Sequence, residues 1–314
     1  MKRMILAALV ALAANCHAQD YPARPVRILV GFTPGGGPDI TARHLAQKLT
    51  EAWGQQVIVE NRPGAGGTLA AAQVARAAPD GYTLLSVSSA HAVGAAIHPK
   101  LGYDTLKDLA GITQTGSSKY VLVSAQFKTL AELLAAARAR PGQLNFSSAG
   151  VGSGTHFAAE IFKSRAGLDV VHVPFKGIPE ALSETLAGRI HFFMAPIANA
   201  VPPVREGRLA GLGVSSLTRD ALLPDVPTVD EAGVRGYQSE LWFGLLTSAA
   251  VPRPIVAKLN RELTRILADA DTRARWLPLG IEPRPTTAEE FDRLVREEVG
   301  VFSAIARSAN IRAE

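Results

Sequence analysis

The sequence predicts an α/β protein of two lobes, each lobe being a mostly parallel sheet flanked by helices. Three observations lead to this prediction. Short apolar runs alternate with stretches whose apolar residues recur at helical spacing, this alternation occurs twice, and no Gly/Ser-rich linker separates the two cycles. Alternating strands and helices imply parallel strands joined by right-handed crossovers. The 314 residues are enough for about two domains, each with its own core.

The expected elements follow in chain order. The first cycle has strands at 26–32, 56–60 and 82–88 and helices at 39–53 and 68–78. The second has strands at 120–124, 145–148, 170–174 and 191–195 and helices at 129–140, 155–166 and 179–187, the first opened by a Thr129/Glu132 capping box. Further strands are expected at 209–215 and 241–247. We expect the first lobe to comprise 20–117 with 221–314, and the second 118–220.

The last seventy residues are expected to be mostly helical. An apolar stripe indicates one helix, through Ile255, Val256, Leu259, Leu263, Ile266 and Leu267. The final helix is expected at 288–309, with Thr286 and Glu289 as its cap.

The N-terminus is typical of a secretory signal peptide at 1–18. Lys2 and Arg3 precede eleven apolar residues, and Cys16-His17-Ala18 resembles a cleavage site. The apolar run is shorter than the roughly 20 residues needed to cross a bilayer. A buried helix is the alternative, and a lipidated Cys16 is a poor fit because Ala13, Ala14 and Asn15 precede it. Cleavage after Ala18 would yield an exported, soluble protein.

Composition excludes several classes. Charged residues are 19% and apolar residues 47%, which argues against disorder. One cysteine excludes a disulfide framework. The net charge of +5 would fall to +3 without the signal peptide. The basic pairs are scattered along helices without interleaved aromatics, so we expect no nucleic-acid binding.

Glycine marks the candidate binding loops. Ten of 28 glycines fall in four loops that follow expected strands, at 32–39, 62–67, 147–156 and 175–177. In an open parallel sheet such loops meet at the carboxyl edge, where ligands bind. Glycine lets backbone N–H groups approach a ligand, and helix N-termini favour anions. Tight turns alone are the alternative, but the similarity of two loops in two units favours a small anion such as a carboxylate.

Enzymatic patterns are weak. There is no P-loop, Gly150-x-Gly152-x-Gly154 is not a dinucleotide fingerprint, and Ser153 lacks the flanking glycines of a nucleophile elbow. The seven histidines show no metal-ligand spacing, so we expect no metal and no cofactor. His156 is either a ligand contact or a packing residue, and Lys176 either faces the cleft or is solvated. Asp39 is expected to be a helix-start residue.

The loops carry a family resemblance that runs from Tyr21 to the C-terminus. The matching segments are YPARPVRI at 21–28, PGGGPDITAR at 34–43, VENRPGAGG at 59–67, PDGYTLL at 79–85, SSAGVGSGTH at 147–156, VPFKG at 173–177, LPDVPT at 223–228 and EAG at 231–233. The chain resembles the substrate-binding proteins of tripartite tricarboxylate transporters, the Bug-type periplasmic receptors. It departs from them at Phe175, where Tyr is usual, at Ala70, where Gly is frequent, and at 248–251.

The resemblance implies a type II, Venus-flytrap periplasmic binding protein that holds a mono- or dicarboxylate between its lobes and serves a membrane permease. It implies that the loops 32–37 and 147–155 hold a carboxylate, partly through ordered water, and that residues 88–90 line the cleft. The expected ligand-binding residues are Phe32, Thr33, Gly35, Gly36, Gly37, Ser88, Ser89, Ala90, Ser147, Ser148, Gly152, Ser153, Thr155, His156 and Lys176. We expect no catalytic residue, a monomer, and closure by hinge motion.

Two alternative functions remain open. A sensor that presents its closed form to a membrane kinase would use the same cleft. A secreted enzyme acting on a small carboxylate would use Ser153 or His156. Measuring ligand uptake and the transcriptional response after gene deletion distinguishes a transport receptor from a sensor. Measuring product formation distinguishes a binding protein from an enzyme.

Overall fold

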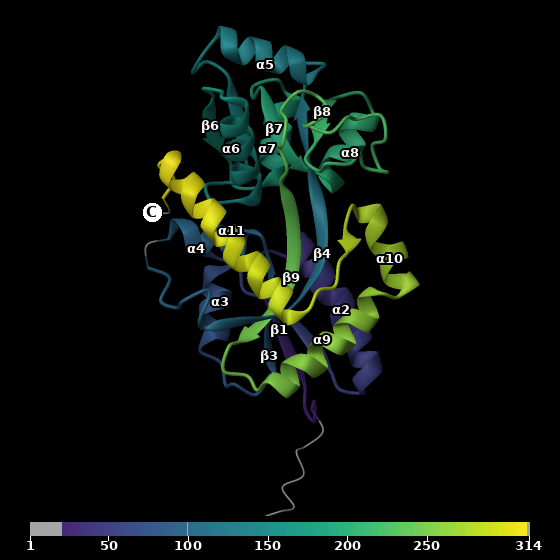
Figure 1. Ribbon diagram of the computed structural model, residues 1–314. Helices are drawn as coiled ribbons and strands as arrows, with labels where there is room; N and C mark the ends of the chain where they lie inside the picture. The colour runs from purple at the N-terminus through teal and green to yellow at the C-terminus, as the bar shows by residue number, and fades with distance from the viewer. Residues whose placement is uncertain (1–20, 99, 313–314) are drawn as a thin grey trace, which may run out of the picture.

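The computed structural model describes residues 21–98 and 100–312, and it shows two lobes, one above the other (Figure 1). The predicted signal peptide at 1–18, with Cys16, lies outside the described residues. Among the described residues, no helix combines the length and the apolar character needed to cross a membrane.

The first lobe, at the bottom of Figure 1, confirms the β-α-β-α-β order. Its opening elements are β1 (Val26–Val30), α2 (Gly37–Trp53), β2 (Val57–Asn61), η1 (Ala65–Gly67), α3 (Thr68–Ala75), β3 (Thr83–Ser88) and α4 (Ala90–Ile97). Strand β1 lies between β2 and β3 and is parallel to both. The chain therefore turns to opposite sides of β1, and this creates a switch point at the carboxyl ends of β1 and β3.

The second lobe repeats this construction. It contains α5 (Leu130–Ala139), β5 (Asn145–Ser148), α6 (Gly154–Ala166), β6 (Val171–Pro174), α7 (Ile178–Leu186), β7 (Phe192–Pro196), α8 (Ile197–Arg205) and β8 (Ala210–Val214). Strand β5 pairs in parallel with β6 and β7, as predicted. Thr129 caps α5 by accepting the Glu132 N–H, and Gly167 ends α6 in the left-handed region.

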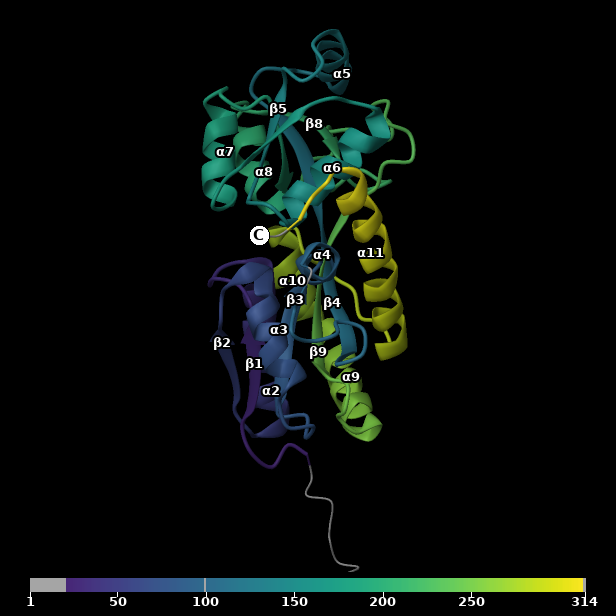
Figure 2. The same ribbon diagram turned by 90° about the vertical axis from the view of Figure 1, so that its left-hand side faces the viewer.

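One long strand joins the lobes. Strand β4 (Leu109–Ser124) pairs antiparallel with β9 (Glu240–Ser248) in the first lobe and with β7 and β8 in the second. The result is a single ten-stranded sheet rather than two separate ones. Figure 2 shows β4 and β9 running through the waist between the lobes. Only 120–124 was predicted, because the earlier part of β4 is rich in Gly, Ser and Thr.

The core of the second lobe extends beyond its predicted end at Asp220. Val229, Val234 and Tyr237 are buried in the same cluster as Phe146 and Phe192. The Tyr237 hydroxyl also donates to the Ala158 carbonyl at 3.0 Å. By packing, the chain returns to the first lobe at β9, later than the 220/221 boundary expected from sequence.

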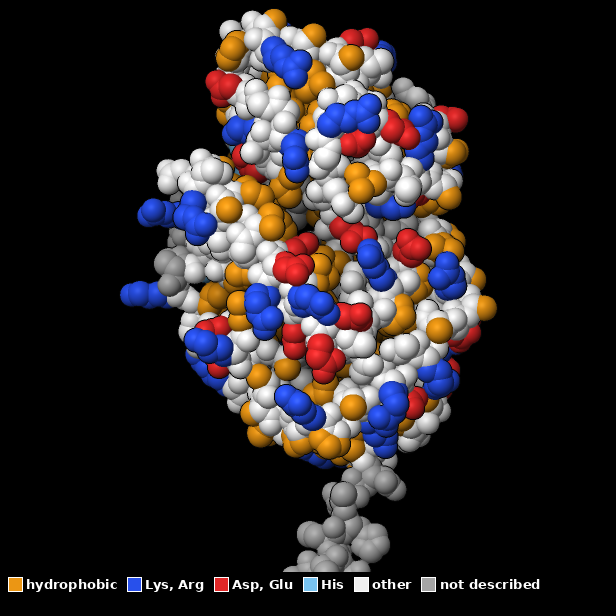
Figure 3. Space-filling model, viewed as in Figure 1, with side chains coloured by type: hydrophobic (Ala, Val, Ile, Leu, Met, Phe, Trp, Pro, Cys, Tyr) orange, Lys and Arg blue, Asp and Glu red, His pale blue; other side chains and the backbone are white. Residues whose placement is uncertain are grey.

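The C-terminal helices cover the first lobe and reach the second. They are α9 (Arg253–Leu267), α10 (Ala270–Trp276) and α11 (Ala288–Ser308), with η2 (Leu277–Leu279) and β10 (Glu282–Pro283) between the last two. Helix α11 lies across the waist, with the Phe302 ring 5.2 Å from the Phe157 ring of α6. The surface narrows where the lobes meet (Figure 3).

The predicted cap of α11 was wrong by one residue. The capping box is formed by Thr287 and Glu290. Thr286 instead bonds to β4: its N–H donates to Thr113 Oγ1, and its hydroxyl accepts the Gln114 N–H, both at 3.0 Å. These contacts with a distant strand decide which of two adjacent threonines caps the helix.

Candidate functional site

The first-lobe loop, residues 32–37, connects β1 to the N-terminus of α2. Thr33 to Gly36 are exposed, whereas Gly37 packs so tightly that an added Cβ would lie 2.3 Å from the Phe243 ring. Glycine therefore lets α2 begin directly against β9. Within the described chain, the N–H groups of Thr33, Gly36 and Gly37 have no protein acceptor.

Asp39 holds this loop in place. Its carboxylate is 3% exposed and accepts hydrogen bonds from Gly35 N (2.9 Å), Asn61 Nδ2 (2.8 Å) and Arg43 Nε (3.0 Å). Burial alone would raise the pKa of Asp39, but the bonds from Arg43, Gly35 and Asn61 lower it below its usual value. The predicted helix-start residue is thus an anion at neutral pH, and its hydrogen bonds organise the loop.

Residues 88–90 lie at the end of β3 and the start of α4, where the two lobes touch. Ser88 and Ser89 are buried, and the Ser89 N–H donates to the Trp242 carbonyl of β9 at 3.1 Å. A Cβ added to Gly154 of the second lobe would lie 2.3 Å from Tyr120 Oη and 3.6 Å from Ser89 Oγ. The start of α6 therefore sits directly against this segment.

The second-lobe loop, residues 147–155, uses most of its own N–H groups internally. Ala149 N donates to Thr155 Oγ1 (2.9 Å), Gly150 N to Ser148 Oγ (3.1 Å) and Gly152 N to His156 Nδ1 (3.3 Å). Ser153 N donates to the Gly150 carbonyl at 3.1 Å. The remaining N–H groups have no acceptor within the described residues, and they belong to Val151, Gly154 and Thr155.

Ser147 and Ser153 have side chains that are already engaged. Ser147 is fully buried and its hydroxyl contacts Thr185 Oγ1 at 3.2 Å, on α7 and away from the loop. Ser153 caps α6 by accepting the His156 N–H at 3.2 Å, and it contacts Thr155 Oγ1 at 2.9 Å. The Ser153 hydroxyl has no bond to a histidine ring, so no nucleophile–base pair is formed there.

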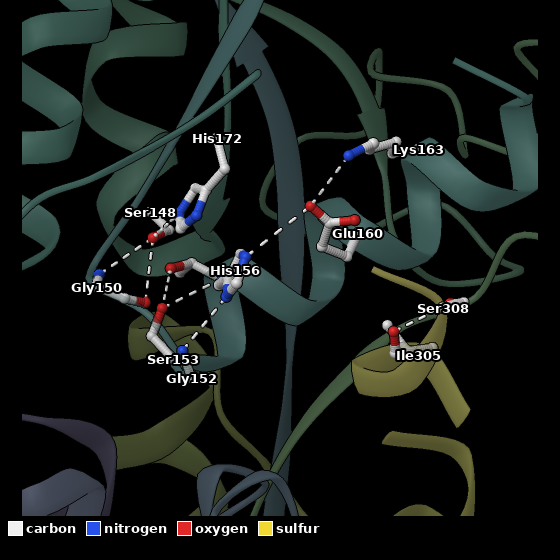
Figure 4. Close-up of polar contacts among 11 residues, drawn as sticks. Ser148, Gly150, Gly152, Ser153, His156, Glu160, Lys163, His172, Ile305 and Ser308 are labelled. Atoms are coloured by element: carbon white, nitrogen blue, oxygen red, sulfur yellow. Dashed lines mark hydrogen bonds and ion pairs between the residues drawn. The ribbon is translucent and has the colours of Figure 1, made fainter. Parts of the chain in front are cut away.

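His156 lies behind the loop in a stack with His172 (Figure 4). The two ring centroids are 3.8 Å apart with an interplanar angle of 12°. His172 Nε2 is 2.6 Å from Ser148 Oγ. Burial lowers the pKa of His156 to about 3 and that of His172 to about 4, so both rings are neutral at physiological pH.

The structure places Lys176 near the second-lobe loop. Phe175 N donates to the Ser148 carbonyl at 3.0 Å, and a Cβ on Gly150 would lie 3.2 Å from the Phe175 carbonyl. Lys176 follows on the exposed turn between β6 and α7. It is a cation close to the loop.

Gly152 brings the loop against the first lobe. Its φ is +79°, and an added Cβ would lie 2.5 Å from Ile97 Cδ1 and 3.9 Å from Val93 Cγ1, both on α4. The second-lobe loop therefore faces α4 and residues 88–90. Glycine is required here for its backbone conformation and for the close approach of the lobes.

Sequence reasoning missed His91, which follows the predicted segment 88–90 on α4. It helps line a cavity of about 10 Å³, roughly the space for one water, at the switch point between β1 and β3. His91 is 7% exposed and its Nε2 has no hydrogen-bond partner in the described chain. Burial lowers its pKa to about 4. Its place directly after a strand end was the available signal.

Two other features lie apart from these loops. An open groove of about 430 Å³ runs along the middle of α2 and β2, away from the carboxyl ends of the strands. Within residues 21–98 and 100–312, no group of three or more His, Cys, Asp or Glu side chains is arranged to hold a metal ion.

Comparison with known proteins agrees with this geometry. Residues 41–311 match the family described as the tripartite tricarboxylate transporter family receptor. The chain is 31% identical to Protein BugT of Bordetella pertussis over 313 residues, which cover 98% of this chain and 96% of BugT.

Solved structures are similar over nearly the whole chain. The structure titled R. palustris Rpa4515 with adipate gives a TM-score of 0.83 at 30% identity, covering 93% of this chain and 99% of that one. MatC (Rpa3494) from Rhodopseudomonas palustris with bound malate gives 0.79 at 36% identity, covering 91% and 99%. Both superpose on the two-lobed fold described above.

Proposed function

Because the chain belongs to the tripartite tricarboxylate transporter receptor family, as a Bug-type periplasmic binding protein, we propose that it captures a small organic carboxylate between its lobes. We further propose that it delivers this ligand to membrane permease subunits of the tripartite tricarboxylate type. The adipate and malate in two similar structures support a carboxylate ligand. The family is one of receptors, and the side chains of Ser153 and His156 are engaged in ways that leave no base for a nucleophile.

The observation that carries the proposal is the set of free N–H groups at two helix starts. Thr33, Gly36 and Gly37 present them at α2, and Val151, Gly154 and Thr155 at α6. Helix N-termini carry partial positive charge, so each group favours a carboxylate oxygen. Asp39, the nearest acid in the first-lobe loop, is paired with Arg43 and therefore does not repel an anion strongly.

The expected ligand-binding residues divide into two roles under this proposal. We propose that the ligand is contacted by the exposed or cleft-facing members, which are Phe32, Thr33, Gly35, Gly36, Gly37, Ser88, Ser89, Ala90, Gly152, Thr155 and Lys176. Ser147, Ser148, Ser153 and His156 shape the loop from behind, since their polar atoms bond within the protein.

A binding assay tests the proposal. Calorimetric titration of the purified protein with malate and adipate is expected to show saturable binding and unchanged ligand after recovery. Gly36→Val is expected to weaken binding at least tenfold without unfolding the protein, because its Cβ would make only ordinary contacts, 3.8 Å from the Thr33 carbonyl and 3.9 Å from Pro38 Cδ, while lying beside the N–H groups. Gly300→Ala, on the far part of α11 with open space around it, is the matched control. Absence of binding to any carboxylate, or conversion of the ligand, would overturn the proposal.

Physiological role, location and assembly are also proposed. We propose export to the periplasm by the segment 1–18, and a monomer in solution, which light scattering coupled to size exclusion tests. Deletion of the gene should abolish uptake of the ligand. Intact uptake with a lost transcriptional response would instead identify a sensor that acts on a membrane kinase.

A further inference from the structure

Two imidazoles, the buried ring of His156 and the half-buried ring of His172, hold the second-lobe loop, and His156 does so through a nitrogen that cannot carry a proton. His156 Nδ1 is 3.3 Å from Gly152 N, which can only donate. His156 Nδ1 must therefore present its lone pair, and the ring proton sits on Nε2. That nitrogen is 3.9 Å from Glu160 Oε1. The ring thus has one defined tautomer, with its acceptor directed at the loop (Figure 4).

His172 acts on the same loop through Ser148. The Ser148 hydroxyl lies 2.6 Å from His172 Nε2 and also accepts the Gly150 N–H at 3.1 Å. A hydroxyl has one proton to donate, and two acceptors compete for it, His172 Nε2 at 2.6 Å and the Gly150 carbonyl at 3.1 Å. With the proton on the shorter contact, the chain of bonds runs from Gly150 N–H to Ser148 and from Ser148 to His172.

The surroundings favour neutral rings. Phe146 also stacks on His172, with ring centroids 4.9 Å apart. The charged groups recorded at the pair are Glu160, which is 5% exposed, and Lys163, whose Nζ is 3.5 Å from Glu160 Oε1. Burial raises the pKa of Glu160, while Lys163 and the neighbouring ring disfavour a proton on His156. A cation in either ring would face its stacked partner.

We propose that His156 and His172 are positioning residues, which set the shape of the second-lobe loop as hydrogen-bond acceptors and do not touch the ligand. The Gly152 N–H bonds to His156 and the Gly150 N–H to Ser148, which His172 contacts, so the N–H groups of Val151, Gly154 and Thr155 are the ones without an acceptor in the described part of the loop. The inference rests on the proposed function for its binding readout. It predicts that the acceptor atom, rather than the aromatic ring, determines affinity.

A matched pair of substitutions tests this at His156. Asn and Leu have similar size and both remove the ring stack, but only Asn places an acceptor near the position of Nδ1. The dissociation constant for malate or adipate is expected to be roughly five- to tenfold higher in His156→Leu than in His156→Asn, the range expected for one hydrogen bond. Equal affinities in the two variants would overturn the inference.

The same design applies to His172. His172→Gln keeps an acceptor near Nε2, and His172→Met does not, so the methionine variant is expected to bind severalfold more weakly. A crystal structure of the complex with a ligand oxygen bonded to either imidazole would overturn the positioning role.

A measurement without ligand separates this inference from the proposed function. Amide hydrogen exchange of residues 149–154 is expected to be faster in His156→Leu than in His156→Asn, because the Gly152 N–H loses its acceptor. If the wild-type protein binds neither carboxylate, the proposed function fails while this exchange result still decides the positioning role. Nitrogen-15 NMR of the wild-type protein needs no variant, and a protonated His156 Nδ1 at pH 7 would overturn the inference.

Discussion

The two glycine loops at 32–37 and 147–155 present free N–H groups at helix starts, but they are held in opposite ways. The first-lobe loop is fixed by an anion, Asp39, with Arg43 and Asn61 around it. The second-lobe loop is fixed by uncharged groups, the Ser148 hydroxyl and the His156 ring among them. The proposed anion site would thus have a charged support on one side and a neutral support on the other.

Solvent explains the difference. The Arg43 side chain is 53% exposed, so the ion pair under the first loop stays partly hydrated. The stacked rings under the second loop lie among β5, β6 and α6, where His156 is only 3% exposed. An ionised group there would lose most of its hydration, which is costly. Neutral acceptors hold a buried loop at lower cost.

The largest expected difference between the two loops is in the free energy of unfolding lost when a loop glycine is replaced by valine. Gly152→Val places a side chain at φ +79° and within 2.5 Å of Ile97 Cδ1, so we expect a loss of about 4 kcal/mol in the free energy of unfolding. Gly36→Val, at φ −79° and with no atom closer than 3.8 Å to the added Cβ, is expected to cost less than about 1 kcal/mol. Urea denaturation measures both. Adding Ile97→Ala to Gly152→Val should recover part of the loss, and no recovery would show that the collision is not the cause.

The next effect concerns the charged support. Asp39→Ala leaves Gly35 N, Asn61 Nδ2 and the Arg43 guanidinium without their acceptor, and we expect a loss of about 3 kcal/mol. His156→Leu removes the neutral acceptor of one N–H, and we expect it to lower the free energy of unfolding by less, about 2 kcal/mol. Asp39→Asn, which keeps an acceptor, is the control. If Asp39→Ala cost no more than His156→Leu, the contrast between the supports would be wrong.

The third effect is the pH at which each support fails. His172 has a pKa of about 4 in the folded protein against about 6.5 unfolded, so the unfolded chain binds protons first as the pH falls. Its stabilisation is complete above pH 6.5 and is lost between about 6.5 and 4, by about 2 kcal/mol after allowance for partial solvation. Asp39 has a lowered pKa, so its contribution persists above its ordinary pKa and is lost only as the pH falls through the lowered value.

Comparison with His172→Gln isolates this effect. Burial raises the pKa of Glu298 to about 7, so that group acts in the opposite direction and loses stabilisation as the pH rises. Its contribution is the same in both proteins and cancels in their difference. We expect the wild-type advantage to shrink between pH 6.5 and 4, and an advantage independent of pH would contradict the neutral support.

The smallest effect lies in the caps. Ser153 caps α6 through its hydroxyl, whereas Gly36 begins α2 with no side-chain cap. Ser153→Ala is expected to cost about 1 kcal/mol, and Gly36→Ser to add a few tenths of that to stability. Thermal unfolding followed by circular dichroism resolves both. A Ser153→Ala protein as stable as the wild type would mean that another group replaces the cap.

Sequence alone predicted the elements that carry a strong local pattern. The strand at 145–148 and the helices after both glycine loops are where they were expected. The first part of β4 and the helix α8, with Pro202 and Pro203 inside it, were not predicted, because composition there argues against regular structure. Their order depends on neighbouring strands that lie far away in sequence.

The loops of the site were predictable, whereas the side chains that hold them were not. Asp39 meets Asn61 and Ser148 meets His172, pairs separated by 22 and 24 residues. No local spacing indicates such partners. The burial of Ser147 against α7 likewise follows from packing between elements rather than from the loop motif.

The continuous sheet has a consequence for how the molecule unfolds. Strand β4 carries backbone hydrogen bonds in both lobes, and Trp242 of β9 lies in the first-lobe core while its neighbour Leu241 packs against the second. Unfolding of either lobe would leave part of this shared strand without its backbone hydrogen-bond partners. The two lobes are therefore expected to melt as one cooperative unit, with a single calorimetric transition, although the proposed ligand site lies between them.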